Sequence, residues 1–279
     1  MTVTKESMDS HGTPLIVKLD GPIVRGDAAK VMAVLKQQRG DRGLVYLDSP
    51  GGDVHEAMSI GRLIRESELT VGVGKCASSC VLVLVGGVQR LLGIEDVTGI
   101  GLHRLYFSSL SPSASTDVVT ARRRKVVAEV SDYLRSMNVT QQLLEMMEAI
   151  PPESIRYLTS KEADNLGLRA PDPVWDERYV AREAADRGTT SMEYRQRRAR
   201  VEVRCDNLLR DIAKYTNCEE ATLLGLKTRE YLERHKRYTT WVSAVRAKHD
   251  DSFPPGAKAP AVLCWRRIHA EAAVDCPVP

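Results

Sequence analysis

The sequence has few aromatic residues and no long apolar run. Its 279 residues include 2 Phe, 3 Trp and 9 Tyr, so a core must be built mainly from Val, Leu, Ile and Ala. The longest apolar candidate, residues 81–85, is far shorter than the roughly 20 residues that cross a bilayer. We therefore expect no membrane span.

A strong charge of one sign is also missing. The formal net charge is +3, from 40 basic and 37 acidic residues, and this excess is too small to indicate a nucleic-acid partner. No pair of cysteines has the two-residue spacing that is typical of zinc sites. We accordingly expect neither a metal nor a cofactor.

Strand-like and helix-like patterns alternate through the first half of the chain. Three short apolar runs are typical of buried strands: 44–47, 71–73 and 100–102. Three longer segments space their apolar residues as helices do: 28–38, 54–65 and 117–137. This order predicts an α/β core of layered helices and parallel strands. Beyond Pro171 and Pro173 the pattern is helical and heavily charged.

Turn-forming or polar residues follow each of the three apolar runs. Ser49-Pro50-Gly51-Gly52 follows the first, Ser78 the second, and His103 the third, twenty-five positions after Ser78. A hydroxyl, an imidazole and a glycine turn are the parts that acyl transfer requires, namely nucleophile, general base and oxyanion donors.

In these motifs the chain resembles the Clp protease proteolytic subunit and its relatives in the ClpP/crotonase superfamily, over residues 16–168. The Cys-Ala-Ser-Ser-Cys run at 76–80 and Gly-Leu-His-Arg at 101–104 are similar to a bacterial ClpP-like group described as predicted periplasmic proteins. The resemblance implies a ClpP/crotonase-like α/β domain at 14–170. The helical pattern beyond it predicts a helical, cysteine-containing C-terminal extension at 171–279.

The resemblance also implies roles for individual residues. Ser78 would be the nucleophile and His103 the general base, while the backbone N–H groups of Gly51 and Ser79 would hold the oxyanion. Two alternatives remain open: Ser79 is the adjacent competitor for the nucleophile, and either serine could simply cap a helix.

The third member of the expected triad is missing from its position. Where the family has an aspartate this chain has Ile155, which cannot orient an imidazole or stabilise its cation. Glu153, Ser154 and Asp172 are the candidate replacements. Two functions follow: a serine endopeptidase that acts on peptides or proteins, or an inactive ClpP-like scaffold that binds a peptide or partner protein. Crotonase-type acyl-CoA chemistry would leave the pair of Ser78 and His103 without a role.

The six cysteines form three couples that are close in sequence: Cys76 with Cys80, Cys205 with Cys218, and Cys264 with Cys276. Such couples suit disulfides and an oxidising compartment, although free buried thiols are an alternative. Residues 1–13 are polar, lack the apolar stretch of a secretory signal, and are expected to be a disordered tail. The cysteines and the resemblance favour a periplasmic or exported protein, whereas the N-terminus as given favours the cytoplasm.

The predicted helix at 117–137 is expected to mediate self-association. Clp-like domains bury this helix against neighbouring subunits, but here it carries four consecutive cations at 122–125. Like charges disfavour stacking into large rings. We therefore expect a small homo-oligomer, a dimer or trimer.

Overall fold

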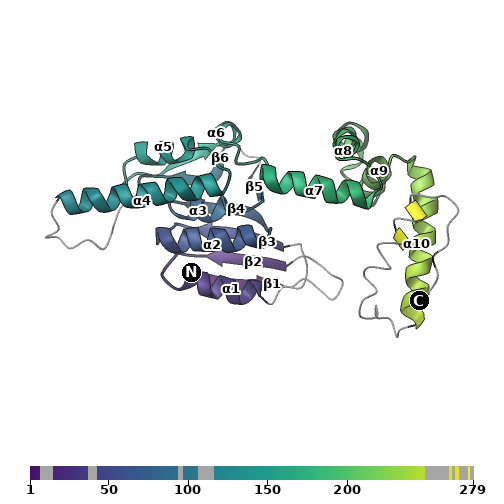
Figure 1. Cartoon of the computed structure of the whole chain (residues 1–279), viewed down its shortest axis with the longest axis horizontal. Helices are drawn as coiled ribbons and strands as arrows, with labels where there is room; N and C mark the ends of the chain where they lie inside the picture. Colours follow the sequence, from purple (N-terminus) through teal and green to yellow (C-terminus); the bar gives the residue numbers. More distant parts are fainter. Residues whose placement is uncertain are drawn as a thin grey trace. The chain divides into compact units, whose positions relative to one another are not determined.

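The computed structural model describes residues 1–6, 15–36, 43–93, 97–105, 116–248, 264–265, 268–269 and 276. The chain divides into two compact units, residues 1–175 and 176–279 (Figure 1). The boundary that the sequence predicts, between 170 and 171, lies just before this division. No helix of the described residues combines the length and apolarity that a membrane crossing requires.

The first unit is built on a sheet of seven strands (Figure 1). They are β1 (Thr2–Glu6), β2 (Leu15–Asp20), β3 (Gly43–Ser49), β4 (Thr70–Ala77), β5 (Gln89–Leu91), β6 (Val97–Leu102) and β7 (Arg156–Thr159). The strand order is β1-β2-β3-β4-β6-β7, and β5 also pairs with β4. The pairs from β2 through β6 are parallel, whereas β1 and β7 pair antiparallel at the two edges. The predicted α/β fold with mostly parallel strands is confirmed.

Helices accompany the sheet in the first unit. They are α1 (Asp27–Leu35), α2 (Val54–Glu66), α3 (Cys80–Leu84), α4 (Thr116–Ser136), α5 (Gln142–Ala149) and α6 (Ser160–Asn165). All five residues of α3 are buried, because this short helix follows directly from a central strand. The hydroxyl of Tyr133 in α4 donates to the carbonyl oxygen of Leu82 at 2.6 Å, which fastens α4 to the core.

The N-terminal residues differ from the prediction. Residues 2–6 form β1, with Thr2 opposite Asp20 and Glu6 opposite Ile16, so the expected disordered tail is wrong for this part. Residues 7–13 lie outside the described residues. This strand forms because β2, its antiparallel partner, satisfies its backbone hydrogen-bonding groups. Val3 also packs against the core, although the segment has no apolar run.

A buried ion pair lies within the first unit. Asp172 is 3% exposed and accepts hydrogen bonds from Asn138 Nδ2 at 2.7 Å and from the Trp175 N–H at 2.9 Å. Arg65 Nη1 lies 2.5 Å from its Oδ2. Although burial opposes ionisation, these partners hold the pKa of Asp172 below its usual value.

The second unit is helical, as the sequence predicts. Its elements are α7 (Pro173–Asp186), which begins in the first unit, α8 (Ser191–Cys205), the 3₁₀ helix η1 (Asp206–Leu208), α9 (Ile212–Leu224) and α10 (Thr228–Lys248). Apolar residues of α7, α8 and α9 form one buried cluster. Two disulfides, Cys205–Cys218 and Cys264–Cys276, lie in this unit.

Candidate active site

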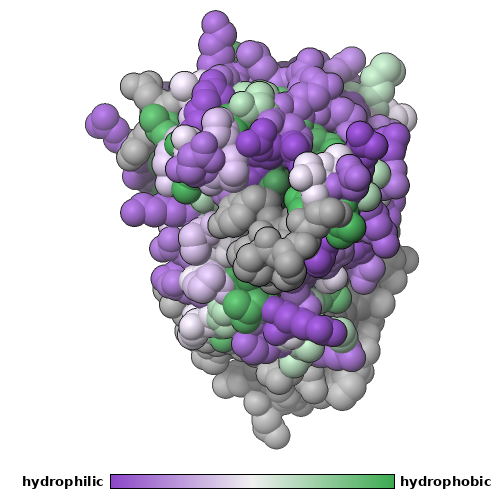
Figure 2. All heavy atoms as spheres, turned by 90° about the vertical axis from the view of Figure 1, so that its left-hand side faces the viewer, coloured by the Kyte–Doolittle hydropathy of each residue, from purple (hydrophilic) through white to green (hydrophobic). Residues whose placement is uncertain are grey.

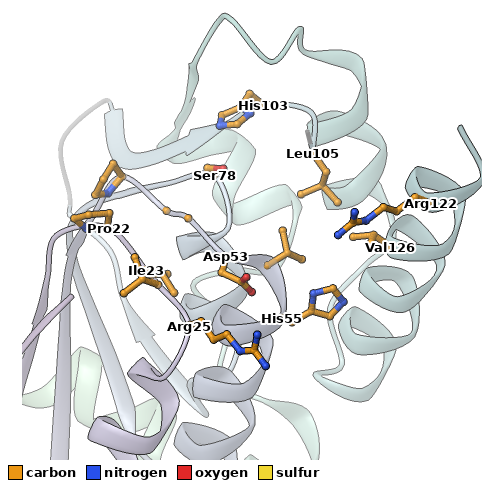
Figure 3. A pocket seen from close by; sticks show the side chains of 15 residues that line it. Pro22, Ile23, Arg25, Asp53, His55, Ser78, His103, Leu105, Arg122 and Val126 are labelled. Atoms are coloured by element: carbon orange, nitrogen blue, oxygen red, sulfur yellow. The ribbon is translucent and has the colours of Figure 1, made fainter. Parts of the chain in front are cut away.

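The three motifs meet at one edge of the sheet. Because β3, β4 and β6 run parallel, their carboxyl ends lie together, which is where open α/β sheets bind ligands. A cleft of about 600 Å³ opens there and is lined by Gly51, Ser78 and His103, among others (Figure 3). The structure thus brings together residues that the sequence separates by more than fifty positions.

Ser78 occupies a sharp turn between the end of β4 and the start of α3. Its φ is +58°, in the left-handed region that non-glycine residues seldom adopt. Its N–H donates to the carbonyl oxygen of Gly101 at 2.9 Å, and its side chain lines the cleft (Figure 3). Strained backbone of this kind is characteristic of functional positions, and a nucleophilic serine on a tight strand-to-helix turn is a recurrent example.

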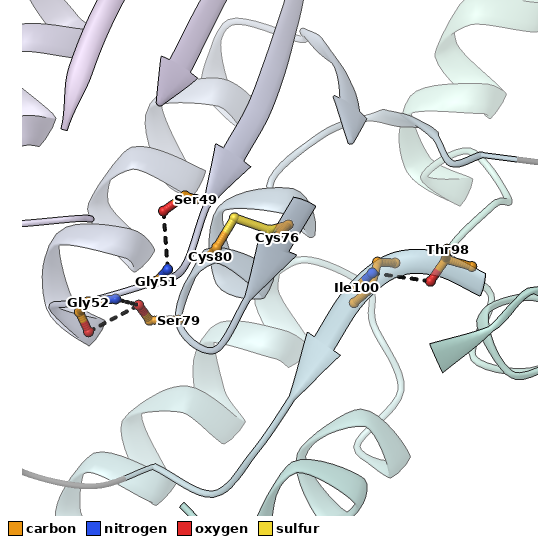
Figure 4. Close-up of a disulfide and its surroundings, with 8 residues drawn as sticks. All are labelled: Ser49, Gly51, Gly52, Cys76, Ser79, Cys80, Thr98 and Ile100. Carbon is orange, nitrogen blue, oxygen red and sulfur yellow. Dashed lines mark hydrogen bonds between the residues drawn. A yellow bond between two sulfur atoms is a disulfide. The ribbon is translucent and has the colours of Figure 1, made fainter. Parts of the chain in front are cut away.

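Ser79 has a different environment from its neighbour. It is 0% exposed, and its hydroxyl both accepts from the Gly52 N–H at 2.7 Å and donates to the Gly52 carbonyl oxygen at 3.0 Å (Figure 4). This reciprocal pair joins the turn after β4 to the glycine turn after β3. The Ser79 hydroxyl is therefore engaged in structure, and Ser78 is the serine of the two that lines the cleft.

Gly51 fits closely against the turn that carries Ser78. Its φ is +92°, and a Cβ added to it would lie 2.7 Å from Ser78 Cβ and 3.0 Å from the Ser79 nitrogen, so only glycine fits. However, the Gly51 N–H donates to Ser49 Oγ at 3.1 Å (Figure 4). One of the two expected oxyanion donors is thus beside Ser78 but hydrogen-bonded elsewhere in this conformation.

His103 directly follows β6 and is 6% exposed. Its Nδ1 lies 2.9 Å from the carbonyl oxygen of Arg104. Because a carbonyl oxygen can only accept, this contact requires the hydrogen to be on Nδ1. The tautomer that results has its lone pair on Nε2, which is the form that a general base needs.

The structure places the candidate third members in different environments. The β6–β7 register pairs Leu102 with Arg156, and continuing it by one residue sets Ile155 opposite His103. Glu153 and Ser154 are exposed and do not line the cleft. Asp172 is engaged by Arg65 and Asn138 and is not among the residues that line the cleft. A backbone carbonyl thus contacts the ring nitrogen that the family's aspartate would contact.

The cysteine couples are all disulfides, which confirms the predicted pairing. Cys76 and Cys80 enclose Ser78, with their Cα atoms 5.3 Å apart (Figure 4). Both cysteines are 0% exposed. The turn that carries Ser78 is therefore fixed covalently at its base.

Charged residues that the sequence analysis did not assign to the site also line the cleft. Arg25 comes from the loop before α1, Asp53 and His55 from the start of α2, and Arg122 from α4 (Figure 3). Arg122 is the first member of the cation run noted in the sequence. Arg25 carries no sequence signal of its own, because only the fold brings its loop to the cleft.

Comparison with known families agrees with this geometry. Residues 9–97 match the family model described as Clp protease. This stretch is similar to Clp protease. The match includes the glycine turn and Ser78 and ends before His103, and it supports either a peptidase or a ClpP-like scaffold. A search of curated proteins found no match to the chain.

Proposed function

We propose that this protein is a serine-type peptidase in which Ser78 and His103 form the catalytic pair. The observation that carries the proposal is the strained backbone of Ser78, φ +58°, at a turn that lines the same cleft as His103. Strained backbone of this kind is often found at functional sites, and here it occurs in a residue that lines the cleft.

The chemistry follows from the groups present. Ser78 Oγ attacks the scissile carbonyl carbon while its proton passes to His103 Nε2. The carbon–nitrogen bond then breaks, the imidazolium returns the proton to the leaving amine, and water hydrolyses the acyl-enzyme by the same route. The N–H groups of Ser79 and Gly51 stabilise the oxyanion. For Gly51 this requires its N–H to turn away from Ser49 when substrate binds.

The alternative function is a scaffold that binds a peptide or partner protein in the same cleft without hydrolysing it. Two observations favour it. Ile155 takes the place opposite His103 where a carboxylate would stabilise the imidazolium, and the Gly51 N–H is already bound to Ser49. A neutral carbonyl at Nδ1 supports the imidazolium less than a carboxylate does.

Labelling with a fluorophosphonate probe tests the proposal. We expect stoichiometric modification of Ser78, located by mass spectrometry, and its loss in Ser78→Ala and His103→Ala. Ser79→Ala separates the two serines, because modification at Ser78 should persist there at a reduced rate. Labelling that survives Ser78→Ala would place the reactive group at another residue and contradict the proposal, and no labelling of a folded wild-type protein would favour the scaffold.

A further inference from the structure

The cleft has a catalytic end and a basic end. Ser78 and His103 lie at one end, whereas Arg25, His55 and Arg122 lie toward the other (Figure 3). The surrounding face, toward which α4 extends, is mostly hydrophilic with scattered apolar residues (Figure 2). The lining of the cleft combines apolar residues with charged ones.

Arg25 is an exposed side chain on a fixed loop. The Val24 N–H donates to Asp27 Oδ2 at 2.8 Å and the Asp27 N–H donates to the Val24 carbonyl oxygen at 3.2 Å, while Asp27 is fully buried. The loop is therefore anchored on both sides of Arg25. Within the described part of the chain, the structure shows no ion pair between Arg25 and a carboxylate.

Arg122 is distinguished from the other cations of its run. Arg123 forms an ion pair with Glu148, and Lys125 Nζ lies 4.0 Å from Glu129. Arg124 is exposed and does not line the cleft. Of the four consecutive cations, Arg122 is the one that lines it. The run that disfavours ring stacking thus contributes one guanidinium to the cleft.

The acidic groups at the cleft do not outweigh these cations. Asp53 caps α2 by accepting the Glu56 N–H at 2.9 Å. His55 Nε2 lies 2.8 Å from Glu129 Oε2, so that carboxylate is already engaged. Among the described residues that line the cleft, Arg25 and Arg122 are cationic and Asp53 is acidic, so the formal charge of this lining favours an anionic ligand over a cationic one.

We propose that the cleft selects peptides with an acidic side chain near the scissile bond, recognised by Arg25 and Arg122. This inference rests on the proposed peptidase function. Arginine suits the role because its planar guanidinium can bind a carboxylate through two hydrogen bonds. The Asp53 carboxylate repels acidic substrates and attracts basic ones. Neutralising Asp53 should therefore strengthen the preference for acidic peptides, whereas neutralising either arginine should weaken it.

The experiment uses peptides that differ only by Glu, Gln or Lys at positions flanking the scissile bond. We expect kcat/KM to follow the order Glu, Gln, Lys, and the Glu-to-Gln ratio to fall about two- to fivefold in Arg25→Gln and in Arg122→Gln. Asp53→Asn keeps the helix cap and should raise that ratio. Arg124→Gln removes the same charge from the same helix outside the cleft and should leave the ratio unchanged.

Binding of the same peptides to the Ser78→Ala protein, measured by fluorescence anisotropy, separates this inference from catalysis. Preferential binding of the Glu peptide without hydrolysis by the wild type would uphold the inference and overturn the peptidase. Hydrolysis without any preference among the three peptides would uphold the peptidase and overturn the inference of acidic selectivity. A response to Arg124→Gln as large as that to Arg25→Gln would also overturn it, because the effect would then come from net charge.

Discussion

The Ser78 N–H donates a hydrogen bond to the carbonyl oxygen of Gly101 at 2.9 Å. Gly101 lies two residues before His103 on β6, so a single backbone contact joins the turn of the proposed nucleophile to the strand of the proposed base. The same turn is joined to the glycine turn through Ser79 and Gly52. The turn of the proposed nucleophile is therefore held to its two neighbours by one backbone hydrogen bond and by the Ser79 hydroxyl.

Restoring an acid opposite His103 should increase reactivity. Ile155 is 50% exposed, so Ile155→Asp introduces a carboxylate without burying it. If the aspartate replaces the Arg104 carbonyl at Nδ1, the imidazolium is stabilised, and we expect labelling of Ser78 to accelerate at least about tenfold. Ile155→Asn is the matched neutral control. Equal labelling rates for the two variants would show that this position does not communicate with His103.

The Ser79 hydroxyl should hold the turn that carries Ser78 in place and should not act as the nucleophile itself. Ser79→Ala leaves the Gly52 N–H and carbonyl without their side-chain partner, which we expect to lower the free energy of unfolding by about 1–3 kcal/mol. Slower labelling of Ser78 should accompany this loss. Ser59→Ala, which removes a hydroxyl bonded to the His55 carbonyl, is the control, with little change in either quantity. Urea unfolding measures the free energy of unfolding, and labelling kinetics measure the reactivity of Ser78. If Ser79→Ala changes neither quantity, the Ser79 hydroxyl does not position the turn.

The Cys76–Cys80 disulfide should support the turn more than the whole fold. It closes a loop of only a few residues, so its effect on the unfolded chain is small, and we expect the double variant C76A/C80A to lose no more than about 2 kcal/mol. Labelling of Ser78 should nevertheless slow markedly. The control is C205A/C218A, which removes a disulfide from the second unit and should leave the labelling rate unchanged. An equal effect of both double variants would mean that the disulfides act only on global stability.

The buried pair of Arg65 and Asp172 predicts acid sensitivity. The pKa of Asp172 lies below its ordinary value in the folded protein, so its contribution to stability is present above the unfolded-state pKa of about 3.9 and is lost as the pH falls through the lower folded-state value. Asp172→Asn leaves Arg65 without its charged partner and should cost about 3 kcal/mol at neutral pH. The difference from wild type should shrink as the pH falls below 4. Denaturant titrations across this range measure it, and a constant difference would exclude the linkage.

Self-association should stop at a small closed oligomer. The four cations at 122–125 lie on α4, and Arg123 pairs with Glu148 of its own chain. A second subunit that packs on this helix must supply acidic groups, because otherwise the cations lose their hydration without a partner. Light scattering at moderate salt should give the mass of a dimer or trimer. A mass of about fourteen subunits would correspond to a double ring and contradict this expectation.

Local patterns in the sequence were sufficient for much of the fold. The apolar runs identify the central strands, and the glycine turn, Ser78 and His103 identify the edge where those strands end. Strand β1 was missed because an edge strand that buries little carries no apolar run; its stability comes from pairing with β2 and from the packing of Val3 against the core. Short spacing in the sequence identified the three cysteine couples, and the structure decides between disulfides and free thiols in favour of disulfides.

The surroundings of the site could not be read in the same way. The engagement of Asp172 depends on Arg65 and Asn138, which are more than thirty positions away. The hydrogen bond from Gly51 to Ser49 depends on the orientation of one peptide plane, for which no residue type gives a signal. Arg25 reaches the cleft only because the loop after β2 lies beside the glycine turn, where Ile23 and Gly52 form a bridge.

The left-handed backbone of Ser78 has a consequence for how this chain can change. An L-residue in that region is less stable than glycine by roughly 1 kcal/mol, so a more stable fold is one substitution away, at Ser78→Gly. That substitution removes the hydroxyl from the cleft. At this position glycine would suit the stability of the fold, whereas serine suits the proposed reaction, and the chain has serine.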